Sequence, residues 1–203
     1  MKQGWNTKKL GDVCDFLNRG ISPKYLENGG VCVLNQKCIR NHQINYELSR
    51  RHDLSSKKVA DERFIQLGDV LINSTGTGTL GRLAQVCEDP IEPTTVDSHI
   101  TIVRPKKALF HLDFFGYMLV VIEDSIKEAG EGCGGQTELA RSILAEKFLV
   151  SYPESIFEQQ LIAAKLNALA IETQCLESIY ERKLTVLKAL KKSLLTHAFS
   201  GSL

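Results

Sequence analysis

The chain has 203 residues, of which 43% are hydrophobic and 24% are charged, and these proportions are typical of a folded globular protein rather than a disordered one. Its longest apolar run, residues 114–122, falls far short of the about 20 residues that a membrane-spanning helix requires, and no secretory signal pattern opens the chain. The net charge of +1 argues against nucleic-acid binding by bulk electrostatics, but it is unevenly spread: residues 1–63 carry 12 basic and 7 acidic side chains, whereas residues 64–153 carry 7 and 12.

Short strand-like runs alternate with turns over residues 1–153, without the regular strand–helix–strand repeat of a parallel sheet. The expected strands are Val31–Leu34, Asp69–Ser74, Leu83–Cys87 and His99–Arg104. The expected helices are Lys57–Phe64, Leu112–Ala129 and Thr137–Ala145. This pattern predicts one globular α/β domain of the mixed α+β type over residues 1–153.

The segment 35–63 is rich in Lys and Arg and mixes them with Asn, His, Gln and Tyr. Arg can bind guanine through two hydrogen bonds, Asn or Gln can do the same with adenine, and Lys mainly contacts phosphates. These residue types favour a major-groove reader, and the acidic balance of residues 64–153 suits a protein partner on another side. A solvated loop that is charged for solubility is the alternative. The candidate DNA-binding residues in and before this segment are Lys24, Lys37, Arg40, Asn41, Arg50, Arg51, Lys57 and Lys58.

A glycine-rich loop, Gly76-Thr77-Gly78-Thr79-Leu80-Gly81, follows an expected strand and matches G-x-G-x-x-G. A dinucleotide site would need a helix beginning at Gly81, because the N-terminus of that helix holds the pyrophosphate. Residues 82–87 are too few for such a helix and are typical of a return strand. The loop is therefore interpreted as a hairpin loop, with a nucleotide-binding oxidoreductase as the rival interpretation. The loop adds three candidate DNA contacts, Thr75, Thr77 and Arg82.

Signatures of catalysis are weak. Asp97-Ser98-His99 contains the residue types of a hydrolase triad, but neighbours in a strand point to opposite faces and cannot form a relay. The sequence has no P-loop lysine, no Asn/Asp-Pro-Pro-Tyr segment and no convincing nuclease cluster of carboxylates and lysine. We therefore expect no catalytic residues in this chain.

The cysteines are scattered and form no C-x-x-C pair, and no histidine lies at zinc-ligand spacing beside them. Free, mostly buried thiols in a reducing cytoplasm are the simplest interpretation, so we expect a cytoplasmic protein without a metal site. The six positions are Cys14, Cys32, Cys38, Cys87, Cys133 and Cys175.

The composition changes abruptly after Pro153. Residues 154–200 contain neither Gly nor Pro, which predicts one long helix that ends at Gly201. Apolar side chains recur along it at alternating spacings of four and three, and a second row widens the stripe. At 1.5 Å per residue this helix is about 65–70 Å long, so its stripe requires another helix, unless two shorter helices fold back as a hairpin. The stripe residues expected to contact a partner helix are Ile162, Leu166, Leu169, Leu176, Tyr180, Leu187, Leu190 and Leu194.

Five segments, in order along nearly the whole chain, resemble the specificity (S) subunit of type I restriction–modification systems. They are the opening Trp5–Val13 (W-x-x-x-x-L-G-D-V), Gly68–Ile72 with the glycine loop, Gly134–Thr137 with Leu144–Phe148, the helix entry Tyr152–Ile162, and the ending Leu187–Gly201, which contains L-x-x-x-L-L-x-x-x-F-x-G. Gln136 and Arg141 lie in or beside the third segment and complete the candidate DNA contacts.

The resemblance implies a target recognition domain that reads half of a split DNA site, with residues 154–203 as a helix for dimerisation and methyltransferase docking. Members of this family typically have two recognition domains and two helices, whereas this sequence has one of each. It therefore resembles half-length S subunits, in which two copies pair through antiparallel helices as a homodimer. The implied partners are double-stranded DNA, methyltransferase (M) subunits and a restriction (R) subunit. S-adenosylmethionine, ATP and Mg²⁺ would be held by those subunits and no cofactor by this chain. A helical assembly protein without DNA binding is the alternative.

Overall fold

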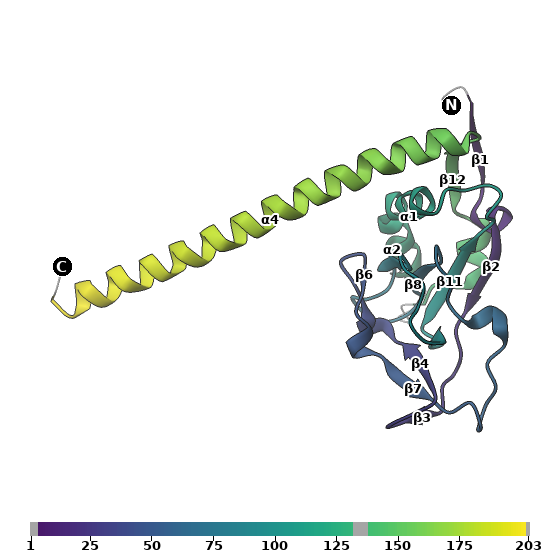
Figure 1. Ribbon diagram of the computed structural model, residues 1–203, viewed down its shortest axis with the longest axis horizontal. Helices are drawn as coiled ribbons and strands as arrows, with labels where there is room; N and C mark the ends of the chain where they lie inside the picture. The colour runs from purple at the N-terminus through teal and green to yellow at the C-terminus, as the bar shows by residue number, and fades with distance from the viewer. Residues whose placement is uncertain (1–3, 132–137, 202–203) are drawn as a thin grey trace. The chain divides into compact units, whose positions relative to one another are not determined.

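The computed structural model describes residues 4–131 and 138–201 (Figure 1). The chain divides into two compact units, Met1–Gln160 and Leu161–Leu203. The first unit contains the strands and the short helices, and the second contains most of one long helix. This is the mixed strand-and-helix domain followed by a long helix that the sequence predicts. No helix in the described ranges is long and apolar enough to cross a bilayer.

An antiparallel sheet lies at the centre of the first unit. Its strands, in spatial order, are β2 (Cys14–Arg19), β11 (Ile100–Pro105), β8 (Val70–Asn73) and β9 (Leu83–Gln85). β8 is buried throughout and β11 is buried except at Arg104, as expected for short, nearly continuous runs of branched apolar residues. The sequence predicts β8, β9 and β11 to within two residues at each end. β2 was not predicted, because its sequence CDFLNR alternates poorly.

The remaining strands form a second sheet and two pairs. The second sheet has the order β10 (Thr94–Val96), β4 (Val31–Leu34), β7 (Arg50–His52) and β3 (Tyr25–Leu26). β10 runs parallel to β4, whereas β7 is antiparallel to both of its neighbours. The antiparallel pairs are β5 (Ile39–Arg40) with β6 (Gln43–Ile44) and β1 (Trp5–Lys9) with β12 (Leu149–Pro153).

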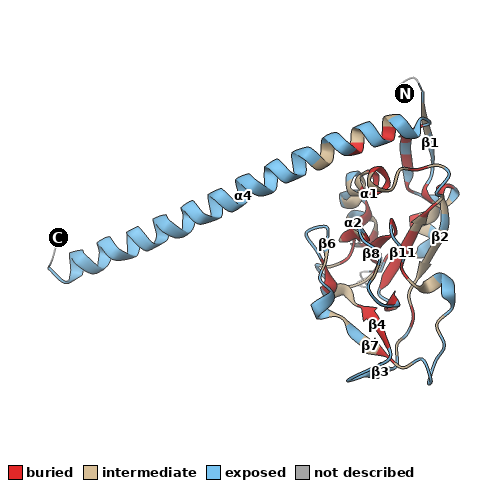
Figure 2. Cartoon of the chain, viewed as in Figure 1, coloured by how far each residue is buried: buried red, intermediate tan, exposed pale blue. Residues whose placement is uncertain are grey.

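One hydrophobic cluster joins the two sheets and the β5–β6 hairpin. The buried residues coloured red in Figure 2 gather on these strands. Because both sheets and the hairpin contribute side chains to the same core, the loops at their ends are held on one scaffold. The members of the cluster are Cys32, Leu34, Cys38, Ile39, Ile65, Leu71, Ala84, Val86, Val96, Ile100 and Ile102.

Gly20 marks a close backbone crossing at the end of β2. A Cβ atom there would lie 2.0 Å from the carbonyl oxygen of Val96 and 2.4 Å from that of Asp97. Backbone atoms cannot rotate away, so we expect Gly20→Ala to lower the free energy of unfolding by about 3 kcal/mol, the upper end for overpacking. Urea denaturation measures this. The control is Gly29→Ala, which meets no atom within 4 Å but has a φ of 77°, so it should cost about 1 kcal/mol. Equal losses would contradict the steric account.

Three short helices were predicted in the first unit, and the structure modifies each. The stretch 112–129 is not one helix: α1 (Leu112–Val121) and α2 (Glu123–Glu131) are separated at Ile122, whose N–H is shared between the carbonyls of Leu119 and Val120. α3 (Arg141–Glu146) ends within one residue of the predicted end but begins later than predicted, because residues 138–140 are not helical. Thr137, the predicted start, lies outside the described residues.

The prediction of a helix at Lys57–Phe64 is wrong. Only a 3₁₀ turn, η4 (Asp61–Arg63), forms there. The Asp53 carboxylate accepts hydrogen bonds from the hydroxyls of Ser55 (2.6 Å) and Ser56 (2.5 Å), and the buried His52 ring donates from Nε2 to the carbonyl of Lys57 at 2.8 Å. These side chains satisfy backbone and polar groups locally and thereby compete with a helix.

The long helix α4 (Ile156–Phe199) begins two residues after the predicted start at residue 154. The strand β12 extends through Pro153, so the chain needs two further residues to enter the helix. The Ser155 hydroxyl accepts a hydrogen bond from the N–H of Glu158 (3.3 Å) and acts as the N-cap. The helix runs unbroken for 44 residues, so the hairpin of two shorter helices is excluded. Every residue from 168 to 201 is exposed, and Figure 2 shows this part of α4 in pale blue.

Candidate nucleic-acid interface

The β5–β6 hairpin presents its tip to solvent. Asn41 and His42 form its two-residue turn with φ of 52° and 58°, the left-handed pair that matches the twist of a hairpin and that Asn tolerates. Asn41 and the neighbouring Arg40 are exposed. The His42 ring lies 2.7 Å from a carboxylate oxygen of Glu123 on α2, so the tip is held against that helix.

The glycine-rich loop is a hairpin loop, as predicted. β8 and β9 on either side of it are antiparallel, with Ile72 opposite Leu83. The chain returns as a strand after Gly81 where a dinucleotide site would need a helix, so that rival interpretation fails on geometry. Within the loop Arg82 donates from Nη2 to the carbonyl of Gly78 at 2.7 Å, while Thr77 is exposed.

A basic recess lies where the hairpin tip, the glycine loop and α2 meet. It encloses about 350 Å³ and is lined by Arg40, Asn41, His42, Arg82, Leu83, Glu123 and Lys127. The structure thus brings together three residues predicted as DNA contacts, Arg40, Asn41 and Arg82. Lys127 was missed, because the α2 sequence alone does not say which of its residues approaches the hairpin. Lys127 is 3.2 Å from Glu123 and 3.1 Å from Asp124, so part of its charge is neutralised.

A network of hydrogen bonds anchors Thr75, the residue just before the glycine loop. Gln36, in η2 (Gln36–Cys38), donates from Nε2 to the Thr75 hydroxyl at 2.7 Å, and this hydroxyl lies 2.7 Å from Nδ1 of His99. The Thr75 side chain is therefore already engaged. The Asp97 carboxylate accepts from the backbone N–H of His99 at 2.9 Å, not from its ring, so these residues form no catalytic relay.

A second group of predicted contacts lies around β7 and the loops beside it. Arg50 stacks 3.4 Å from the centre of the Tyr25 ring, and Arg51 is 2.7 Å from Glu92. Lys57 donates to the carbonyl of Ser22 at 3.2 Å. Two further lysines, Lys24 and Lys58, are exposed. Both arginines in this group have an intramolecular contact that the sequence did not indicate.

The last predicted contacts are dispersed. Arg141 on α3 donates to the side-chain oxygen of Asn18 on β2 at 3.0 Å, beside the pair formed by Arg19 and Glu138. Lys37 is exposed in η2. Gln136 lies outside the described residues.

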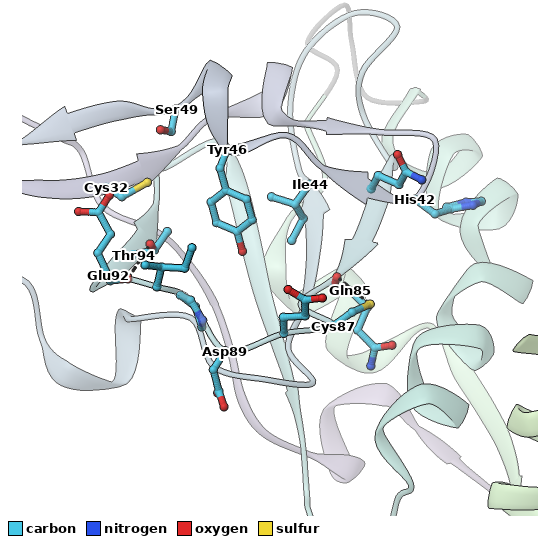
Figure 3. Close-up of a pocket in the computed structure, with 14 residues that line it drawn as sticks. Cys32, His42, Ile44, Tyr46, Ser49, Gln85, Cys87, Asp89, Glu92 and Thr94 are labelled. Atoms are coloured by element: carbon cyan, nitrogen blue, oxygen red, sulfur yellow. Dashed lines mark hydrogen bonds between the residues drawn. The ribbon is translucent and has the colours of Figure 1, made fainter.

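An acidic pocket of about 580 Å³ lies between η3 (Tyr46–Leu48), the β5–β6 hairpin and the loop that follows β9. Figure 3 shows Tyr46 pointing into it beside Ile44. Its lining carries the carboxylates of Glu88, Asp89 and Glu92. Burial, together with negative neighbours that include Glu88, raises the pKa of the Tyr46 hydroxyl. Carboxylates repel phosphates, so this side of the domain does not suit a DNA backbone.

The prediction of mostly buried thiols holds only in part, because two of the five described cysteines are buried, and Cys133 lies outside the described residues. Cys32 and Cys38 are buried, Cys87 and Cys175 are exposed, and burial raises the pKa of Cys14 to about 12. Over residues 4–131 and 138–201, no three His, Cys, Asp or Glu side chains gather as metal ligands.

Comparison with known proteins identifies the family of this chain. The family model described as the type I restriction modification DNA specificity domain matches residues 2–182. The chain belongs to this family. The match covers the strand-and-helix unit and more than half of α4, so these two parts occur together in the specificity-domain family. Among curated proteins, no sequence matches the chain.

Solved structures share the fold at low sequence identity. One similar chain comes from a study of the structural basis of complex assembly and conformational transition in the type I R-M system. It superposes on this chain with a TM-score of 0.76 at 21% sequence identity, and the match covers 100% of this chain and 47% of that one. The HsdS subunit from Thermoanaerobacter tengcongensis gives 0.68 at 20% identity, over 100% and 46%. The type I S subunit from M. genitalium gives 0.58 at 15% identity, over 86% and 41%. The chain therefore spans just under half the length of these proteins.

Proposed function

We propose that this protein is a non-catalytic DNA specificity subunit of a type I restriction–modification system, and that its strand-and-helix domain reads one half of a bipartite target. The observation that carries the proposal is the family match over residues 2–182. The basic recess adds a physical reason, because Arg40, Arg82 and Lys127 present cations around one cavity beside two exposed loops. Arg and Lys at such a position can bind phosphates, while Asn41 at the hairpin tip can reach a base edge.

The exposed stripe of α4 supports a homodimer. Leu169, Leu176 and Leu187 are each more than half exposed on a helix about 66 Å long. Burial of such a row is the usual driving force for helix pairing. By symmetry, two copies would prefer a palindromic target in which an unread spacer separates the half-sites.

The chemistry of the system would belong to other subunits. M subunits, docked on the paired helices, would hold S-adenosylmethionine and methylate adenine, and the R subunit would use ATP and Mg²⁺. In this account the protein contributes positioning alone and acts in the cytoplasm.

Salt-dependent DNA binding tests the proposal. We expect the full-length protein to bind a random-sequence duplex of about 30 base pairs with a log–log salt slope of several units between 50 and 200 mM salt. Arg40→Ala combined with Arg82→Ala should reduce the slope by about two, because each phosphate contact contributes about one. Lys147→Ala, a basic residue away from the recess, is the control and should leave the slope unchanged. A lack of measurable binding, or only weak binding that salt does not change, would favour the helical assembly protein without DNA contact.

A further inference from the structure

A pocket lined by both apolar and polar side chains lies at the beginning of α4. It encloses about 470 Å³ and is lined by Leu67, Gln85, Val86, Cys87, Phe110, His111, Leu112, Asp113 and Ile156. Leu67 and Ile156 are 36% and 40% exposed, and Phe157, beside the pocket in sequence, is 75% exposed. The first turn of the helix therefore leaves two large apolar side chains in contact with water, and Leu67 adds a third beside them.

The wall of this pocket is fixed in place by Gln159. This side chain is fully buried, accepts a hydrogen bond from the backbone N–H of His111 at 2.9 Å, and donates to the carbonyls of Leu109 and Pro153 at 2.9 and 2.8 Å. The amide thus ties the first turn of α4 to the segment that precedes α1. A pocket whose wall is held by hydrogen bonds to a fully buried side chain is organised before a ligand arrives.

The other end of the same helix carries an apolar side chain without a cover. Phe199 is 90% exposed, and Leu194 and Leu195 are about half exposed. Phe199 lies one turn beyond Leu195 and continues the second row of the apolar stripe. It is also the aromatic residue of the ending L-x-x-x-L-L-x-x-x-F-x-G, to which the dimer stripe alone gives no role.

The charges at the two ends of the helix are opposite. Residues 154–164 contain Glu154 and Glu158 and no Lys or Arg, whereas residues 185–201 contain Lys188, Lys191 and Lys192 and no Asp or Glu. In a parallel pair the acidic ends would meet and the basic ends would meet. An antiparallel pair places each basic end beside an acidic beginning, which is the favourable arrangement. In such a pair that overlaps along the whole stripe, the last turn of one helix lies beside the first turn of the other.

We propose that Phe199 of one copy docks in the pocket at the beginning of α4 in a second copy. The proposal rests on the homodimer of the proposed function and assigns it a contact beyond the helical stripe. Twofold symmetry makes the contact reciprocal, so each recognition domain is held by the end of its partner's helix. This contact would fix each domain against the paired helices and thereby stiffen the spacing between the half-sites.

Cys87 lines the pocket and is exposed, which allows a direct crosslinking test. In the full-length protein with Cys133→Ser and Cys175→Ser, Phe199→Cys should be joined to Cys87 of the second copy by a short bismaleimide. We expect most of the protein to migrate as a covalent dimer, and the crosslink to disappear when Cys87→Ser is added. His197→Cys, on the opposite side of the same helical turn, is the matched control and should crosslink weakly.

Light scattering on the uncrosslinked protein tests the homodimer separately from the docking of Phe199. A dimer that yields no Phe199→Cys crosslink overturns the docking proposal and leaves the proposed function intact. A monomer overturns both the homodimer and the docking. As a second measurement that does not depend on cysteine geometry, Phe199→Ala should raise the dimer dissociation constant at least tenfold, whereas Phe199→Leu, which still fills the pocket, should raise it by less than threefold. Equal effects of these two variants would contradict docking of the side chain.

Discussion

Replacement of Leu176 and Leu187 by aspartate is expected to convert the protein into a monomer. Both side chains are more than half exposed on α4 and belong to the stripe of the proposed helix pair. Full burial of a leucine contributes about 1.5–3 kcal/mol, and the dimer would lose four of them, in addition to the cost of burying charge. Four leucines correspond to about 6–12 kcal/mol, of which even a third is about 2–4 kcal/mol. With the added cost of burying charge, we expect the dimer dissociation constant to rise at least 1000-fold, or about 4 kcal/mol.

Analytical ultracentrifugation measures this change, and a matched variant controls for the helix itself. Ser178→Asp with Thr185→Asp introduces the same two charges on exposed positions of the same helix, where the side chains only bond back to the carbonyls of Cys175 and Glu181. This variant should remain dimeric, and circular dichroism should show equal helix content for both. If the leucine variant stays a dimer at micromolar concentration, the stripe is not the dimer interface.

Removal of Arg104 is expected to destabilise the domain more than any other single substitution considered above. Arg104 donates from Nε and Nη2 to the two oxygens of Asp69, both at 2.8 Å, and from Nη2 to the carbonyl of Phe64 at 2.8 Å. Asp69 is 1% exposed, and its pKa is raised by burial against the opposing pull of Arg104. Arg104→Met leaves a buried carboxylate without its charged partner, although the backbone N–H of Gln66 still donates to it at 2.8 Å, so we expect a loss of about 3–5 kcal/mol at pH 7.

The pH dependence of this loss identifies its cause. A lone buried carboxylate has a folded-state pKa above its unfolded value, so its cost is present at higher pH and disappears as the pH falls through the folded-state pKa. The deficit of Arg104→Met relative to wild type, measured by urea denaturation, should therefore shrink as the pH is lowered from 7 toward 4. Asp69→Asn combined with Arg104→Met removes the buried charge and should recover much of the lost stability at pH 7. A deficit that is independent of pH in the single variant would assign the loss to packing instead.

The long helix and the buried strands could be predicted from sequence because each depends on local composition. Residues 154–200 lack helix breakers, and β4 and β8 are runs of branched apolar residues. β7 could not be predicted, because its sequence is Arg-Arg-His and its place in the sheet is supported by distant partners. Arg51 pairs with Glu92, and the His52 ring accepts a hydrogen bond from the N–H of Lys24. Tertiary contacts of this kind override local propensity.

The candidate site shows the same limit. Arg40 and Arg82 are 42 residues apart in sequence. Each could be proposed as a DNA contact from its residue type and its local segment, but only the fold shows that both line one recess. Lys127 was missed, because the sequence of α2 alone does not say which of its residues approaches the hairpin. Arg50 was proposed as a DNA contact, and its stacking on Tyr25 was not visible from the sequence, because Tyr25 comes from a two-residue strand without apolar periodicity.

The measurement that tests the central claim most directly is a map of methylated adenines across the genome, in cells that express the M subunits with and without this gene. The account predicts that one bipartite, palindromic motif is methylated only when the gene is present, and that Leu176→Asp with Leu187→Asp abolishes this methylation. An unchanged map after deletion of the gene, in cells without a second S subunit, would contradict the assignment of this protein as a DNA specificity subunit.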